Sequence, residues 1–203
     1  MKAMIDGPAG LLEACVEAGS DAAAPYALVC HPHPLFGGTM DNKVVTTVAR
    51  ALNACGMPTI RFNFRGVGAS AGRYDDGRGE TDDAAAVAAW GARRFGTRAM
   101  LLAGFSFGAY VAMRLAQTLR PSRLILIAPP VGRFEFTPLA APDCPWLIVQ
   151  GDADDVVDPK AVRKWADTHR PLARLNMLTG VGHFFHGHLV ELRNAIETEI
   201  RSG

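Results

Sequence analysis

Short apolar runs recur along this chain and alternate with segments of helical periodicity. Several of the runs contain no polar residue, which is typical of central parallel strands covered on both faces. The pattern therefore predicts an α/β protein with a doubly wound, mostly parallel sheet. The expected strands are Leu11–Glu17, Tyr26–His31, Thr59–Asn63, Ala99–Ala103, Arg123–Ala128, Trp146–Gln150 and Arg174–Leu178.

Helical segments lie between these strands, and the chain start is predicted to form an antiparallel hairpin at the sheet edge, turning near Gly7 and Gly10. No repeat, low-complexity tract or linker interrupts the pattern, so we expect a single domain over residues 1–203. The expected helices cover Val44–Cys55, Thr81 to Phe95 with Thr81, Asp82 and Asp83 at its start, Ala109 to Pro121, Asp158 to His169, and Leu189–Ile200.

The composition excludes several classes of protein. The formal net charge is +1 and no basic run occurs, so no nucleic-acid partner is expected. No segment reaches the roughly eighteen apolar residues of a membrane span, and the N-terminal MKAMIDGPAG lacks the apolar stretch of a signal peptide. Scattered cysteines (Cys15, Cys30, Cys55 and Cys144) fit reduced thiols in a cytoplasmic protein better than a disulfide framework. Nothing indicates an oligomeric state.

The segment GFSFG sets Ser106 between Gly104 and Gly108, after an apolar run and before a helical pattern. In such a strand–turn–helix setting, G-x-S-x-G is typical of a turn that exposes a serine nucleophile. The glycines lack Cβ atoms, so strand and helix can approach closely while the serine takes a strained conformation. The Phe107 amide would open the helix and face developing negative charge. We predict a nucleophile here rather than an ordinary turn.

A serine hydroxyl needs a base, and the base needs an orienting acid. Both should follow later strands, at the same edge of the sheet. The acidic candidates after the strand WLIVQ are Asp152, Asp154, Asp155 and Asp158, of which Asp158 is better explained as a helix N-cap. The histidine candidates in TGVGHFFHGHL are His183, His186 and His188. The order along the chain is serine, acid, histidine, as in α/β-hydrolases.

The chain resembles an α/β-hydrolase-fold serine hydrolase over essentially its whole length. It is most similar to small bacterial hydrolases related to dienelactone hydrolase and short-chain carboxylesterases. The resemblance rests on HPHPLFGGTMDN, RFNFRGVGAS, AGFSFGAY, QGDADDVVDP and GVGHFFHG. It implies Asp154 as the catalytic acid, with Asp155 as the alternative, and His183 as the base. His186 and His188 are expected at the start of the final helix, facing solvent. No acidic or cysteine ligand lies near these histidines in sequence, so no metal site is expected.

The loop HPHPLFGG is expected to supply a second oxyanion donor, which must be a backbone N–H. Proline has none, so the candidates are the amides of His33, Leu35 and Phe36, and we predict Leu35. His31 and His33 are expected to orient this loop by hydrogen bonding.

The turn RFNFRGVGAS resembles D-x-R-G-x-G-x-S of many α/β-hydrolases, with Asn63 in place of the usual aspartate. Arg65 and Ser70 are expected to connect loops beneath the site. The functional alternative is that Arg65 binds an anionic substrate.

Residues 129–145, PPVGRFEFTPLAAPDCP, are rich in proline and too short for a helical cap. We therefore expect an open site walled by aromatic side chains, namely Phe36, Phe107, Phe134, Phe136 and Phe184. The expected activity is hydrolysis of small or short-acyl carboxylic esters through an acyl-enzyme, with no metal or organic cofactor. The alternatives are acyl transfer, thioester or amide hydrolysis by the same residues, and a non-catalytic binding protein of the same fold.

Overall fold

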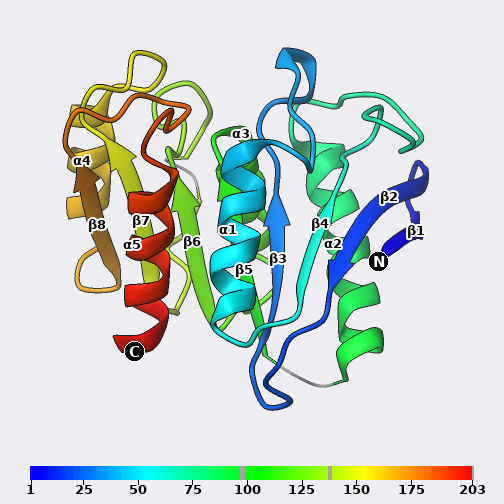
Figure 1. Cartoon of the computed structure of the whole chain (residues 1–203). Coiled ribbons are helices and arrows are strands. Elements are labelled where there is room, and N and C mark those ends of the chain that lie inside the picture. Colours follow the sequence, from blue (N-terminus) through cyan, green and yellow to red (C-terminus); the bar gives the residue numbers. More distant parts are fainter. Residues whose placement is uncertain (97–98, 137–138, 203) are drawn as a thin grey trace.

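One eight-stranded sheet organises the computed structural model, which describes residues 1–96, 99–136 and 139–202 (Figure 1). The strands are β1 (Lys2–Gly7), β2 (Gly10–Glu17), β3 (Tyr26–Cys30), β4 (Thr59–Phe62), β5 (Met100–Phe105), β6 (Arg123–Ile127), β7 (Trp146–Gly151) and β8 (Ala173–Leu178). The helices are α1 (Lys43–Ala54), α2 (Arg78–Phe95), α3 (Phe107–Leu115), α4 (Pro159–Asp167) and α5 (Leu189–Ser202), with a short 3₁₀ turn, η1 (Pro34–Phe36).

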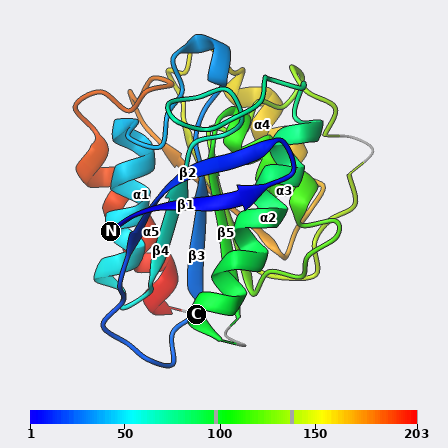
Figure 2. The same ribbon diagram turned by 90° about the vertical axis from the view of Figure 1, so that its right-hand side faces the viewer.

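The strand order is β1-β2-β4-β3-β5-β6-β7-β8. Strands β1 and β2 form an antiparallel hairpin with Gly7 opposite Gly10, and β2 also runs antiparallel to β4. All other neighbours are parallel. Figure 2 shows the hairpin crossing the sheet edge nearest the viewer. The predicted doubly wound, mostly parallel sheet is therefore confirmed.

Two apolar cores fill the space between sheet and helices, because successive residues of a strand face opposite sides. Leu28 of β3 belongs to the core under α2, α3 and α4, whereas the next residue, Val29, belongs to the core under α1 and α5. Figure 1 shows α1 and α5 together on one face of the sheet. This double cover explains why the central strands contain so few polar residues.

Helix α2 begins three residues before the predicted start at Thr81. Its N-cap is Gly77, whose φ of 86° lies in the left-handed region that glycine tolerates. The Glu80 carboxylate accepts hydrogen bonds from the amides of Asp75 and Gly77, at 2.9 and 2.8 Å, and so caps the first turn. The predicted start was therefore three residues late, because the cap lies at Gly77 and Glu80; Asp83 pairs with Arg65 instead.

Helix α3 ends at Leu115, earlier than the predicted stop at Pro121. The amides of Gln117 and Thr118 bond to carbonyl groups three residues back, which tightens the chain into a turn. The Gln117 side chain also bonds the backbone of Ala140 through both its oxygen and its nitrogen. This contact with a distant loop accounts for the early end of the helix.

The connection from β6 to β7 shows no helical cap in its described residues. Its described residues form turns and an isolated bridge between Val131 and Phe134, with no helix among them. The carboxyl ends of the parallel strands therefore remain uncovered by any added helical element in the described part of the chain.

Candidate functional site

Ser106 occupies a sharp turn between β5 and α3. Its φ of 52° and ψ of −119° place a non-glycine residue in a sparsely populated conformation, and its amide is fixed by the Ile127 carbonyl at 2.8 Å. A Cβ at Gly104 would lie 2.1 Å from the Gly108 carbonyl oxygen, and one at Gly108 would lie 2.3 Å from the Cys30 carbonyl oxygen. Both glycines are thus required for α3 to pack this close to β3 and β5.

The structure joins Ser106, His183 and Asp154 in one chain of hydrogen bonds. The Ser106 Oγ lies 3.1 Å from His183 Nε2, and His183 Nδ1 lies 2.8 Å from Asp154 Oδ2. His183 and Asp154 are both buried. An Nδ1–H donated to the carboxylate leaves Nε2 free to accept the serine proton.

The Asp154 carboxylate is held by four donors. Besides His183, its Oδ2 accepts from Gln150 Nε2 at 2.8 Å, and its Oδ1 accepts from the amides of Val156 and Val157 at 2.8 Å each. Burial by itself would raise the pKa of Asp154, but the hydrogen bonds from His183, Val157 and Gln150 outweigh it and hold that pKa below its ordinary value. The group therefore stays ionised at neutral pH.

The other acidic candidates lie elsewhere. Asp155 is exposed and makes no side-chain hydrogen bond to the described residues. Asp158 caps α4 by accepting from the Lys160 amide at 2.9 Å, as predicted, and Asp152 accepts from the Gly180 amide at 2.6 Å. Among these carboxylates, the structure brings only Asp154 to His183.

The remaining histidines of the last loop do not join this arrangement. His186 is exposed and stacks on Phe184, and His188 lies directly before α5, where its Nδ1 is 3.2 Å from Glu191 Oε1. Within the described ranges, no group of three or more histidine, cysteine, aspartate or glutamate side chains is arranged to hold a metal ion.

Two residues that support the site were missed from the sequence. Gln150 donates to Asp154, and the signal for it was a polar residue ending an otherwise apolar strand. Phe105 packs beneath the base, with its ring centroid 5.2 Å from that of His183. A phenylalanine in an apolar strand gives no such signal by itself.

His31 fixes the HPHP loop to the sheet. It is fully buried, with Nδ1 2.6 Å from the Pro32 carbonyl oxygen and Nε2 3.0 Å from the Phe64 amide nitrogen, so Nδ1 donates and Nε2 accepts. Burial lowers the pKa of His31 to about 4, which keeps the ring neutral. The expectation that it orients this loop agrees with the geometry.

His33 lines the pocket of Ser106, whereas Leu35 does not. The Leu35 amide donates to His33 Nδ1 at 3.2 Å, and its side chain is 67% exposed and does not line the pocket around Ser106. The His33 carbonyl accepts from the amides of Phe36 and Gly38. His33 Nε2 then donates to Tyr74 Oη at 3.0 Å, and burial lowers the pKa of the imidazole. The amide predicted as the second oxyanion donor, that of Leu35, therefore already has an acceptor within its own loop.

A pocket of about 380 Å³ adjoins Ser106. Of the predicted aromatic walls, Phe36, Phe107 and Phe134 line it. Phe136 does not, because it is buried against Tyr110 and Trp165. The remaining lining residues are His33, Pro130, Arg133, Val156 and Val157. Phe184 lies beside His183 and is half exposed.

The turn after β4 is structural. Arg65 forms a two-pronged ion pair with the buried Asp83, at 3.0 Å from Nε and 2.7 Å from Nη2. Ser70 Oγ donates to the Asn63 carbonyl at 2.7 Å and accepts from the Glu13 amide at 2.9 Å. Since its guanidinium is committed to Asp83, Arg65 does not line the pocket of Ser106.

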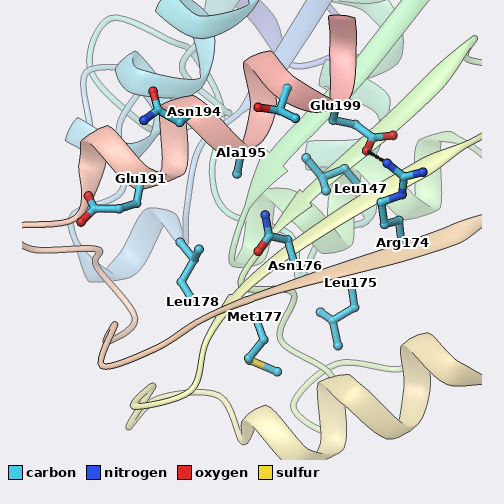
Figure 3. A pocket seen from close by; sticks show the side chains of 11 residues that line it. Leu147, Arg174, Leu175, Asn176, Met177, Leu178, Glu191, Asn194, Ala195 and Glu199 are labelled. Atoms are coloured by element: carbon cyan, nitrogen blue, oxygen red, sulfur yellow. Dashed lines mark hydrogen bonds and ion pairs between the residues drawn. The ribbon is translucent and has the colours of Figure 1, made fainter. Parts of the chain in front are cut away.

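A second hollow, of about 510 Å³, lies between β8 and α5 (Figure 3). Its charged side chains include Arg174 and Glu199, which pair at 3.0 Å, and Glu199 also pairs with Arg123 at 2.8 Å. None of Ser106, Asp154 and His183 lines it. We therefore locate the candidate active site at the pocket of Ser106.

The arrangement at Ser106 contains the parts needed for nucleophilic catalysis: a hydroxyl, a base within hydrogen-bond reach, and a buried carboxylate behind the base. The Phe107 amide, at the N-terminus of α3, has no acceptor among the described residues and so remains available to a developing oxyanion.

No helix in the described part of the chain is long and apolar enough to cross a membrane.

Comparisons with known proteins agree on the family. A family model described as an alpha/beta hydrolase domain matches residues 29–191. A protein of Rickettsia prowazekii, described as uncharacterized, is 37% identical over 202 residues, which cover 94% of this chain and 84% of that protein.

Solved structures give the same result. One from Xanthomonas campestris, described as an a/b serine hydrolase without lid, is 46% identical with a TM-score of 0.93 and covers 100% of this chain and 94% of that chain. An alpha-beta serine hydrolase homologue from Coxiella burnetii is 43% identical with a TM-score of 0.93. The match covers 98% of this chain and 96% of that chain. This chain belongs to the α/β-hydrolase family and has the architecture of its small serine hydrolases without a lid.

Proposed function

We propose that the protein is a carboxylic-ester hydrolase that acts on small, short-acyl esters through an acyl-enzyme at Ser106. The observation that carries the proposal is the unbroken hydrogen-bonded chain from Ser106 Oγ through His183 to Asp154. Family membership supports a hydrolase, and this chain of groups is suited to acyl transfer to water.

In the first half-reaction, Ser106 Oγ attacks the ester carbonyl carbon while His183 Nε2 takes the hydroxyl proton. Asp154 stabilises the imidazolium that results and keeps Nδ1 protonated. The tetrahedral intermediate collapses, His183 returns the proton to the leaving alcohol, and an acyl-serine remains. Water, deprotonated by His183, then attacks the acyl-serine, releases the carboxylic acid and regenerates Ser106.

The oxyanion is proposed to be bound by the amides of Phe107 and His33. The Phe107 amide begins α3, where the unsatisfied N–H groups of a helix attract negative charge. His33 lines the pocket with Ser106, and its amide has no acceptor among the described residues, whereas the Leu35 amide is already used. His33 thus replaces Leu35 in the proposal.

The pocket's shape favours short acyl groups. Phe36 on its rim is 85% exposed, and no helix of the described residues covers the site. Each CH₂ of a long chain left in water loses up to about 0.8 kcal/mol of binding, so two or three such groups already cost roughly tenfold in affinity. We expect best turnover on acyl chains of about two to six carbons, on the same reasoning.

The test is labelling by a fluorophosphonate probe followed by rates on a panel of esters, thioesters and amides of increasing acyl length. Wild type should be labelled, Ser106→Ala should not, and the highest kcat/KM should fall on short esters. Labelling that survives in Ser106→Ala would refute the assignment of Ser106 as the nucleophile. If kcat/KM were highest on thioesters or amides, the assignment as an ester hydrolase would be wrong. A jump in rate above the micellar threshold of the substrate would refute the open site for short acyl chains.

A further inference from the structure

The pocket beside Ser106 contains one permanently charged side chain in its lining. Arg133 is that residue, and its companions in the lining are aromatic or aliphatic apart from Ser106 and His33. Burial lowers the pKa of the His33 imidazole, so that ring is neutral at neutral pH. No acidic residue lines this pocket.

The turn that carries Arg133 is anchored, although Arg133 itself is exposed. The amides of Arg133 and Phe134 both donate to the Pro130 carbonyl, at 3.1 and 3.3 Å. The Phe134 ring stacks on Tyr110 with a centroid separation of 4.8 Å and meets Phe107 edge-on at 5.5 Å. Phe134 thus holds the turn against α3, and Arg133 lies in the lining of the pocket that contains Ser106.

The charge of Arg133 has no ionic partner among the described residues. Its guanidinium makes no ion pair or hydrogen bond with the described residues, in contrast to Arg65, which is paired with Asp83. Two acidic residues lie in the neighbourhood: Glu135 follows in the same loop, and Asp76 interacts electrostatically with His33. Neither forms an ion pair with Arg133.

We propose that Arg133 binds a carboxylate of the substrate, so that the preferred substrates are small esters carrying an anionic group a short apolar distance from the reacting carbonyl. This assignment rests on the proposed esterase activity at Ser106 and deepens it. A guanidinium offers several N–H donors in one plane and pairs with a carboxylate through two parallel hydrogen bonds. The apolar lining between Arg133 and Ser106 suits the linker that separates the two polar groups.

The location of Arg133 predicts which kinetic constant responds. A group that binds a remote, non-reacting part of the substrate equally in the ground and transition states changes KM more than kcat. Because the guanidinium is exposed, its attraction for an anion should also weaken as ionic strength rises. A residue that only supported the fold would show neither behaviour.

The experiment compares two substrates with one leaving group: the para-nitrophenyl ester of pentanoic acid and the para-nitrophenyl half-ester of glutaric acid, each corrected for spontaneous hydrolysis. They differ by a terminal carboxylate. The enzymes are wild type, Arg133→Gln, Arg133→Lys and Arg120→Gln. Arg120 is an exposed arginine after α3 that does not line the pocket, so its variant makes the same charge change elsewhere.

The measured quantity is kcat/KM for the anionic ester divided by kcat/KM for the neutral one. Arg133→Gln should lower this ratio by up to about fivefold, mainly through KM, as expected for one exposed charge-assisted contact. Arg133→Lys should keep most of the ratio, Arg120→Gln should leave it unchanged, and added salt should lower it in wild type. Equal loss on both esters, or an unchanged ratio in Arg133→Gln, would overturn the proposal.

The two proposals fail separately. Absence of Ser106-dependent hydrolysis of either ester would refute the esterase. Hydrolysis of the neutral ester with no effect of Arg133→Gln on the ratio would refute only the carboxylate-binding role.

Discussion

Replacing Asp154 by asparagine changes a single oxygen to NH₂ and should nearly abolish catalysis. The carboxylate accepts four hydrogen bonds, from His183, Gln150, Val156 and Val157. An amide has only one oxygen. If that oxygen stays with the two backbone amides, its NH₂ faces the donors of Gln150 and His183. The imidazole is then driven to the tautomer with the proton on Nε2, which cannot accept the Ser106 proton.

The magnitude follows from these two losses. The wrong tautomer removes the general base, which costs roughly three to four orders of magnitude in kcat, or about 4 to 5.5 kcal/mol of transition-state stabilisation. Once the imidazole has changed tautomer, its Nδ1 accepts from the new NH₂, and only the Gln150 donor is left without an acceptor in a buried site. This costs about 1–3 kcal/mol, so the free energy of unfolding should fall by about that amount. The loss of activity must therefore be measured where the variant is still folded.

The assay is kcat on a short-acyl nitrophenyl ester at neutral pH, together with urea unfolding of the same preparations. Asp155→Asn is the matched control, because it makes the same chemical change at an exposed neighbour. It should keep activity near wild type and shift stability by no more than about 0.5 kcal/mol. If Asp154→Asn keeps a tenth of wild-type kcat, or Asp155→Asn is the more damaged, the assignment of the acid is wrong.

Three other changes test the surrounding structure. Gly108→Ala should lower stability by about 1–3 kcal/mol and reduce turnover, since its Cβ would lie 2.3 Å from the Cys30 carbonyl oxygen; unchanged urea unfolding would contradict the close packing. Ser106→Ala should stop turnover while shifting the free energy of unfolding by no more than about 1 kcal/mol, and a circular dichroism melt well below wild type would show that the residue is structural. Acidification should destabilise the protein, because the unfolded state takes up a proton on His31 below about pH 6.5 whereas the folded state does so only near pH 4. The cost should reach about 3 kcal/mol over that window, and His31→Gln should flatten this part of the unfolding curve; an equal slope in the variant would assign the effect to other groups.

Local signals in the sequence determined the class of fold and the position of the turn that carries Ser106. Unbroken apolar strands require cover on both faces, which leaves a parallel sheet between helices as the main solution. The turn at Ser106 is also local, because it depends on glycines within two residues of the serine that allow strand and helix to approach. The spacing of the acid turn pointed to Asp154 through the family resemblance.

Other features depended on hydrogen bonds that form only in the folded chain. Helix α2 begins at Arg78 because Gly77 and Glu80 cap it there, while Asp83 pairs with Arg65 of a preceding loop. The Leu35 amide is taken up by the side chain of His33, two residues before it, so the proposed oxyanion donor is His33 instead. Which side chain occupies an amide is decided by the folded loop.

Arg133 shows most clearly what could not be predicted from the sequence. In sequence it is one arginine in a proline-rich loop, and only the packing of Phe134 on Tyr110 and Phe107 places it beside Ser106. Periodicity and turn chemistry act over a few residues, so a sequence states them directly. The partners of a side chain are decided by which surfaces bury together in the folded chain. Ser106 and His183, for example, are 77 positions apart in the sequence.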